Sequence, residues 1–116
     1  MEIVEGREGG ACTIQLRVNE GERAHFEGFQ QLVRDRLESG QRDFVVNLNA
    51  CNWIDSTGLG ELVKSLVAVM RHGGNMRLAE VPPRLLGVLN MTNLTSVFEV
   101  FPTQAEAVAS FEGPRP

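Results

Sequence analysis

Apolar and polar residues alternate between positions 11 and 18. A period of two predicts a half-buried β-strand, whose buried side carries Cys12, Ile14, Leu16 and Val18. The short segment Ile3-Val4-Glu5 precedes it across several glycines and is expected to be its hairpin partner. From about His25 the period changes to three and four residues, which predicts an amphipathic helix that ends before Gly40. Its apolar stripe consists of Phe26, Phe29, Leu32, Val33 and Leu37.

The middle of the chain repeats this order of strand and helix. The run from Phe44 to Leu48 is mostly apolar and rich in strand formers, so we expect a central strand covered on both faces. After Asp55 a helical stripe begins, and His72-Gly73-Gly74 provides its end, because glycine readily adopts a left-handed conformation. The stripe consists of Leu59, Leu62, Val63, Leu66, Val67 and Met70.

The last third of the chain predicts two strands and two short helices. Met76, Leu78 and Val81 suggest a fourth strand, and Pro82-Pro83 can start a third helix with Leu85, Leu86 and Leu89. Asn93 falls at the end of this helix and tolerates the left-handed region. Residues 97–101 predict a final strand. Thr103 and Glu106 form a capping box for a last helix, which bears Ala105, Val108, Ala109 and Phe111.

This alternation predicts an α/β fold, with a small sheet of four to five strands covered by about four helices. The chain has 116 residues, of which 42% are hydrophobic and 22% are charged, as in ordinary globular domains. We therefore expect residues 1–116 to form a single domain, with a core from about 11 to 111 and a frayed tail at 112–116.

Charge and cysteine content exclude several classes of function. The net charge is −4 and the isoelectric point is near 5.1, so neither nucleic acid nor an anionic membrane is an expected partner. The sequence shows no membrane span and no signal peptide, which favours a cytoplasmic protein. Cys12 and Cys51 lie in apolar segments without metal-ligand spacing, and we expect both to be reduced and packed.

Side chains suited to catalysis are few. His25 and His72 lie at helix ends, where a histidine needs no functional role. The sequence has no phosphate-binding glycine loop, and Lys64, the sole lysine, lies in the middle of a helix. Ser56 lies outside any nucleophile-elbow motif. We therefore expect no catalytic residue, no metal site and no cofactor.

The hexapeptide Asp55-Ser56-Thr57-Gly58-Leu59-Gly60 is the most informative segment, because it joins a strand to a helix with small polar residues and glycines. It allows two interpretations. In the first, Asp55 or Ser56 only caps the helix, and the glycines allow a tight turn. In the second, Ser56 accepts a phosphate, which the positive end of the helix would hold without basic side chains.

This segment carries a resemblance to a known family. The run 46–60, followed by Gly73-Gly74, Met76-Arg77-Leu78 and the run 89–101, resembles a STAS domain of the bacterial anti-sigma-factor antagonist type. The resemblance covers residues 11 to 111. Its strongest parts are the Asp-Ser-Thr-Gly-Leu-Gly hexapeptide and the ending Leu-x-x-Val-Phe-Glu-Val-Phe, which together at this separation are a specific signal.

The resemblance implies a mixed sheet with helices and a regulated binding protein that is not an enzyme. It implies that Ser56 is phosphorylated by a partner that is both serine kinase and anti-sigma factor, with Thr57 a less favoured acceptor. The unphosphorylated form would bind this partner and release the sigma factor, and a phosphatase would restore binding after phosphorylation. Nucleotide would enter only through the kinase.

The expected recognition surface is the segment 55–60 and the exposed face of the following helix. Gly58 and Gly60 would allow close approach of the partner. The expected contact residues on the helix, chosen because they lie off the apolar stripe, are Glu61, Lys64, Ser65 and Arg71.

The chain also departs from the family pattern. Many antagonists have Gly-x-Leu-Asp before the first helix, whereas this chain has Val18-Asn19-Glu20-Gly21-Glu22-Arg23, in which Glu20 or Glu22 could replace the acid. Other functions therefore stay open. They are a scaffold subunit of a stressosome-like assembly or a lipid- or transporter-associated STAS protein, an enzyme with Ser56 as nucleophile, and a domain in which the segment is only a helix cap.

Overall fold

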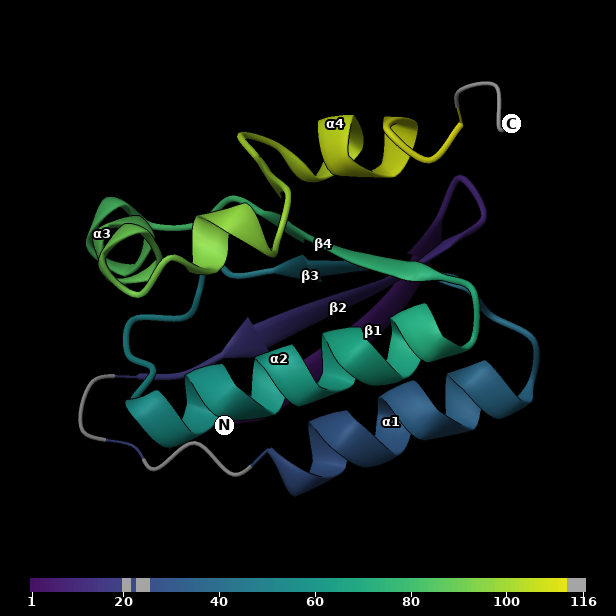
Figure 1. Ribbon diagram of the computed structural model, residues 1–116, viewed down its shortest axis with the longest axis horizontal. Coiled ribbons are helices and arrows are strands. Elements are labelled where there is room, and N and C mark those ends of the chain that lie inside the picture. The colour runs from purple at the N-terminus through teal and green to yellow at the C-terminus, as the bar shows by residue number, and fades with distance from the viewer. Residues whose placement is uncertain (20–21, 23–25, 113–116) are drawn as a thin grey trace.

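Five strands form one mixed sheet in the order in which they occur in the sequence (Figure 1). The computed structural model describes residues 1–19, 22 and 26–112. Within this part of the chain the strands are β1 (Glu2–Glu8), β2 (Ala11–Arg17), β3 (Asp43–Asn47), β4 (Asn75–Ala79) and β5 (Val100–Phe101). The predicted α/β fold and the central place of the third strand are confirmed.

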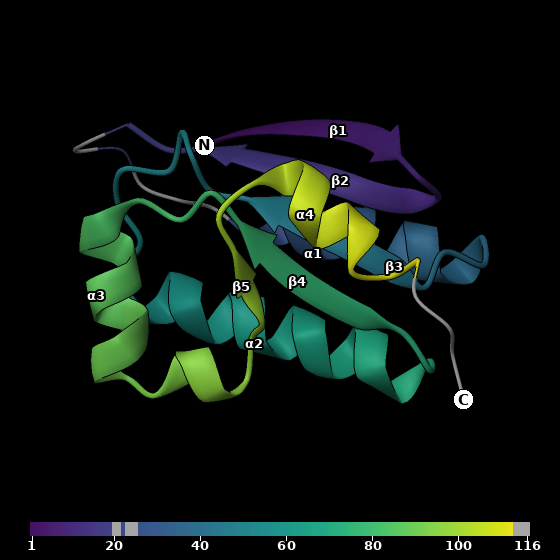
Figure 2. The same cartoon turned by 90° about the horizontal axis from the view of Figure 1, so that it is seen from above.

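Helices lie between consecutive parallel strands and after the last one. They are α1 (Glu27–Glu38), α2 (Ser56–Arg71), α3 (Pro83–Met91) and α4 (Gln104–Ala109), with a short 3-10 turn η1 (Leu94–Ser96) after α3. Figure 1 shows α1 and α2 together against one face of the sheet and α4 on the opposite face. In Figure 2, α3 lies beyond the carboxyl end of β4.

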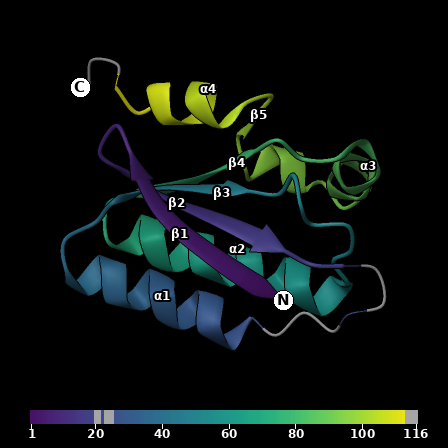
Figure 3. The same cartoon turned by 180° about the vertical axis from the view of Figure 1, so that it is seen from behind.

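The register aligns residues of neighbouring strands that point to the same face of the sheet. β1 and β2 form the predicted antiparallel hairpin, in which Ile3 lies opposite Leu16, and the turn uses Gly9 and Gly10 at φ +55° and +83°. The other neighbouring strands are parallel. Figure 3 shows β1 as the outer strand on its side of the sheet.

The main core lies between the sheet and helices α1, α2 and α3. The alternating residues of β2 point into it, as predicted, and are at most 1% exposed. Phe44 and Val46 of β3 join them from the centre of the sheet. The helices contribute Phe29, Val33, Leu37, Leu62, Leu66, Val69, Leu85 and Leu89.

A smaller core covers the other face of the sheet under α4. Val45 and Ala79 point towards this face, where they pack with Ala11, Ala107, Val108 and Phe111. The Arg77 guanidinium lies 4.0 Å from the centre of the Phe111 ring. β3 is thus buried on both faces, which explains its nearly continuous apolar sequence.

Most of the predicted helix boundaries agree with the structure. Asn93 has φ +62° and Gly73 has φ +83°, the left-handed conformations expected at these ends. Pro82 and Pro83 start α3, and the Thr103 hydroxyl accepts a hydrogen bond from the Glu106 amide. The predicted helix start at His25 lies outside the described residues, as does the predicted tail 112–116 except for Glu112.

Four predictions about the elements are wrong in part. The final strand contains only Val100 and Phe101, because the amides of Val97 and Phe98 instead bond to the Leu94 carbonyl in a turn that continues η1. β4 ends at Ala79, before Val81. In α4 the buried face carries Ala107 and Val108, whereas the expected Ala105 and Ala109 are exposed. On α2, Val67 and Met70 are 39% and 56% exposed.

Candidate functional site

The connection from β3 to α2 carries the candidate site, and β2 holds its first half in place. Val18 donates an amide hydrogen bond to the Ala50 carbonyl at 3.1 Å, and Asn52 donates one to the Val18 carbonyl at 3.0 Å. Cys51 forms the β-bridge to Val18 between these bonds. The connection therefore leaves the sheet along a fixed path.

Asp55 fixes the second half of the connection as the N-cap of α2. Its backbone is extended, at φ −89° and ψ 178°, and its Oδ1 accepts a hydrogen bond from the Gly58 amide at 2.8 Å. Its carbonyl accepts the first helical bond, from the Leu59 amide. This geometry is that of a helix N-cap, as the sequence predicted for Asp55.

Ser56 and Thr57 follow as the first two residues of α2, and both side chains are exposed. The amides at these helix positions have no acceptor within the helix and carry partial positive charge. Within the described part of the chain, no side chain forms a hydrogen bond to the Ser56 hydroxyl. The site thus presents an exposed hydroxyl at the positive end of a helix, and no described side chain is hydrogen-bonded to it.

The two glycines of the segment have different roles, and neither lies in a loop, because residues 56–60 are helical. A Cβ at Gly58 would lie 2.8 Å from the Phe26 ring and 2.9 Å from the Ile54 side chain, whereas a Cβ at Gly60 would meet nothing within 4 Å. Gly58 and Leu59 are buried. The expected role of Gly58 in partner approach is therefore wrong: its small size serves internal packing.

The expected contact residues on α2 also differ in exposure to solvent. Lys64 and Arg71 are exposed, and Lys64 forms an ion pair with the partly buried Glu61 at 3.3 Å. The Glu61 carboxylate also accepts a hydrogen bond from Gln30 of α1. Ser65 is only 4% exposed and contradicts the expectation, because it lies on the side of α2 that carries Leu62 and Val69.

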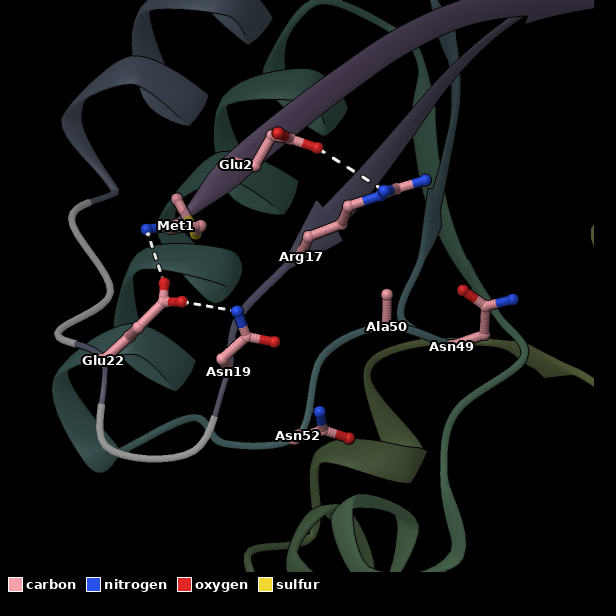
Figure 4. Close-up of a pocket in the computed structure, with 8 residues that line it drawn as sticks. All are labelled: Met1, Glu2, Arg17, Asn19, Glu22, Asn49, Ala50 and Asn52. Carbon is pink, nitrogen blue, oxygen red and sulfur yellow. Dashed lines mark hydrogen bonds and ion pairs between the residues drawn. The ribbon is translucent and has the colours of Figure 1, made fainter.

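Of the two candidate acids after β2, Glu20 and Glu22, the structure describes only Glu22. Glu20 lies outside the described residues. Glu22 is exposed, and its carboxylate accepts hydrogen bonds from the side-chain amide of Asn19 at 2.7 Å and from the N-terminal ammonium at 3.2 Å (Figure 4). These two bonds, the Asn19 bond above all, lower the pKa of Glu22.

Glu22 borders a polar hollow of about 560 Å³ at the carboxyl ends of β2 and β3 (Figure 4). An ion pair between Arg17 and Glu2, at 3.6 Å, lies along it. The remaining lining residues are Met1, Asn19, Asn49, Ala50 and Asn52. The charged groups that line the hollow form ion pairs with each other, and Glu22 is held in place by its pair with the N-terminal ammonium.

Both cysteines are buried and unbridged, as expected. Burial raises the pKa of Cys12 to about 11, with a further contribution from the neighbouring Glu5 carboxylate, which accepts its S–H at 3.7 Å. Burial likewise raises the pKa of Cys51 to about 11. Both thiols therefore stay protonated and unreactive near neutral pH.

No group of three or more histidine, cysteine or acidic side chains in residues 1–19, 22 and 26–112 is placed to hold a metal ion. No described helix has both the length and the apolar character needed to cross a bilayer.

The site also contains a residue that the sequence analysis did not single out. Trp53 lies two residues before the cap, between Asn52 and the buried Ile54, and is 51% exposed. A tryptophan is usually well covered in a folded protein. The signal available in the sequence was the single tryptophan of the chain, next to the polar Asn52 and close to the predicted helix start.

The fold and this segment match a known family. A family model described as the STAS domain matches residues 23–107, which is most of the chain. The chain belongs to the STAS domain family. A Thermotoga neapolitana relative, named as an anti-sigma factor antagonist TM1081 homolog, is 32% identical over 93 residues, covering 79% of this chain and 80% of its own length.

Solved STAS structures share the architecture of this chain. The crystal structure of TM1081 from Thermotoga maritima has a TM-score of 0.82 at 22% identity, covering 96% of this chain and 95% of that one. The phosphorylated form of the Bacillus cell fate determinant SpoIIAA has a TM-score of 0.72 at 18% identity, covering 95% and 99%. At these identities the likeness establishes the STAS fold.

Proposed function

We propose that this protein is an anti-sigma factor antagonist that phosphorylation of Ser56 switches off. The observation that carries the proposal is the exposed Ser56 hydroxyl at the first position of a helix already capped by Asp55, in a STAS domain. The antagonist name of the Thermotoga neapolitana relative and the phosphorylated SpoIIAA structure support it. The protein acts in the cytoplasm as a binding partner rather than as an enzyme.

The switch is a phosphoryl transfer at Ser56. The Ser56 oxygen forms a bond to the γ-phosphorus of ATP held by the partner kinase, the bond to the β–γ bridging oxygen breaks, and ADP leaves. The hydroxyl proton passes to a base of the kinase. Hydrolysis by a phosphatase returns the serine and releases inorganic phosphate.

The phosphate changes the local surface more than the fold. It brings about −1.5 to −2 charges, which moves the net charge from −4 to about −6. The first-turn amides of α2 stabilise this charge, whereas the Asp55 carboxylate beside it adds repulsion. The partner loses affinity because this charge must be desolvated in the interface.

The recognition surface consists of exposed residues at the start of α2 and along the helix. These are Asp55, Thr57, Gly60, Lys64 and Arg71. Glu61 and Gln30 extend the surface to α1 through their hydrogen bond. An anti-sigma factor that is also a serine kinase is the proposed partner.

Incubation with this kinase and ATP tests the site. Intact mass spectrometry should show one added phosphate, and peptide mapping should place it on Ser56. The Ser56→Ala variant should gain none, whereas Thr57→Ala should be modified like the wild type. A phosphate on Thr57, or an unchanged rate in Ser56→Ala, would contradict the assignment.

Affinity for the anti-sigma factor tests the switch. We expect Ser56→Asp to bind at least tenfold more weakly than the wild type and Ser56→Ala to bind like it, because only the former adds charge. Circular dichroism should show the same fold for both variants. Equal affinity of Ser56→Asp and wild type, or isolation of the wild type as a large defined particle without an anti-sigma factor, would favour a scaffold function.

A further inference from the structure

Trp53 presents a half-exposed aromatic side chain three residues before Ser56. We propose that its indole is the anchor that inserts into an apolar pocket of the anti-sigma factor when Ser56 is unphosphorylated. The side chain is 51% exposed although it is the only tryptophan of the chain. This inference rests on the proposed function and names the chemistry of its partner: an apolar pocket the size of an indole.

The backbone on both sides of Trp53 is fixed, so the indole is presented by a rigid segment. The Cys51 amide bonds to the Leu48 carbonyl, and its thiol donates to the Trp53 carbonyl at 3.7 Å. On the other side Ile54 is buried at 6% exposure and Asp55 caps α2. A preorganised side chain loses little conformational entropy on binding, and an aromatic residue has few rotatable bonds to fix.

Position distinguishes Trp53 from the other large exposed apolar residues. Single exposed apolar side chains are common and need no explanation. The others are valines and methionines on β1, the later part of α2, the end of α3 and the turn after η1: Val4, Val67, Met70, Met91 and Val97. Tryptophan is enriched among residues that dominate binding energy, whereas valine is under-represented. Only Trp53 combines that residue type with proximity in sequence to Ser56.

A hollow borders the segment that precedes Trp53 in the sequence. It has a volume of about 210 Å³ and lies where the β3–α2 connection meets the start of α3. Its lining residues are Cys51, Asn52, Pro82, Arg84 and Leu85. The connection that carries Trp53 is thus flanked by a recess at its junction with α3.

An anchor at Trp53 explains how one phosphate abolishes binding. Seating the indole brings the first turn of α2, with Ser56, against the apolar rim of the partner's pocket. A neutral hydroxyl tolerates that contact, but a phosphate with about −1.5 to −2 charges strongly resists desolvation. The same insertion that gives affinity therefore makes the interface sensitive to modification.

The decisive experiment uses the serine-kinase anti-sigma factors encoded in the source genome, each purified individually. Calorimetry measures the affinity of this protein and of its variants for each of them. Trp53→Ala should weaken binding at least about thirtyfold, the loss typical of a dominant interface residue. Met91→Ala is the matched control, because Met91 is 89% exposed on α3, and it should bind within twofold of the wild type. Both variants should unfold at a urea concentration close to the wild-type midpoint.

The possible outcomes separate this inference from the proposed function. If the wild type binds and Ser56→Asp does not, but Trp53→Ala binds like the wild type, the anchor is refuted and the switch stands. If the wild type binds no kinase of the panel and gains no phosphate, the proposed function fails and the anchor with it. A loss of affinity in Trp53→Ala, with wild-type affinity in the control Met91→Ala, supports the anchor.

Fluorine NMR gives a second readout that needs no substitution by alanine. Protein grown with 5-fluorotryptophan should give one resonance, because the chain has a single tryptophan. Addition of the anti-sigma factor should shift this resonance as solvent is excluded from the ring. A resonance that keeps its shift and its solvent exposure in the saturated complex would overturn the proposal.

Discussion

Gly58 shows how strongly a single residue determines the site. We predict that Gly58→Ala lowers the free energy of unfolding by about 1–3 kcal/mol, because its Cβ would collide with Phe26 and Ile54 at 2.8 and 2.9 Å. Gly60→Ala is the control: it meets open space in the same helix and should raise that energy by about 0.5–1 kcal/mol. Urea unfolding measures both. Equal effects of the two substitutions would contradict the packing role of Gly58.

The buried thiols predict a loss of stability at alkaline pH. Folding raises the pKa of Cys12 and of Cys51 from 9.0 to about 11, so the folded chain retains protons that the unfolded chain releases. The stability that this provides is complete below about pH 9 and falls as pH rises towards 11. The chain has no tyrosine and one lysine, so few other groups titrate in this interval.

Unfolding midpoints in urea between pH 8 and 11 measure this effect. The double variant Cys12→Ala/Cys51→Ala should show a much smaller fall in stability across the same interval, although it is less stable at neutral pH. Parallel curves for the wild type and the double variant would show that the thiols are not the cause.

At the scale of the elements, the start of α2 depends on one carboxylate. We predict that Asp55→Ala lowers the free energy of unfolding by about 1 kcal/mol, because the Gly58 amide loses its acceptor. Asp55→Asn keeps an oxygen at that position and should retain most of the stability. Denaturant titration of both variants measures the difference, and an equal loss in Asp55→Asn would point to the charge rather than to the cap.

Elements with a strong period were predictable from sequence, and elements with a weak one were not. The period of two in β2 and the stripes of α1 and α2 are long enough to determine which face is buried. In α4 several alanines share six residues, so the sequence does not distinguish Ala107 from Ala105 and Ala109. The apolar residues after η1 resemble a strand, yet Phe98 reaches the core from a turn.

The candidate site was predictable in its chemistry and less so in its geometry. Asp55 was found as the helix cap from residue type and position, because capping residues precede helices. The role of Ser56 stays a prediction. Ser65 was misjudged by its polarity, although its spacing from Leu62 and Val69 places it on the buried side of α2. Gly58 was misjudged because its neighbour Phe26 is far away in sequence, and the absence of a side chain does not reveal what fills its place.

For the whole molecule, the sheet order predicts where the structure is most stable. β3 is central and covered on both faces, whereas β1 and β5 are edge strands. We predict that the amides of Val45 and Val46 exchange with solvent most slowly and those of β1 among the fastest of the sheet. Hydrogen exchange followed by NMR measures this order, and slower exchange in β1 than in β3 would contradict it.

The sequential order of the strands also bears on how the protein is made. Each strand pairs with the one synthesised just before it, so a nascent chain can extend the sheet from β1 to β5 as it leaves the ribosome. The helices against the main core are made along the way, but α4 comes last. Until residues 104–111 emerge, Val45 and Ala79 have no cover on their face. This face is therefore the last part of the sheet to be covered during synthesis.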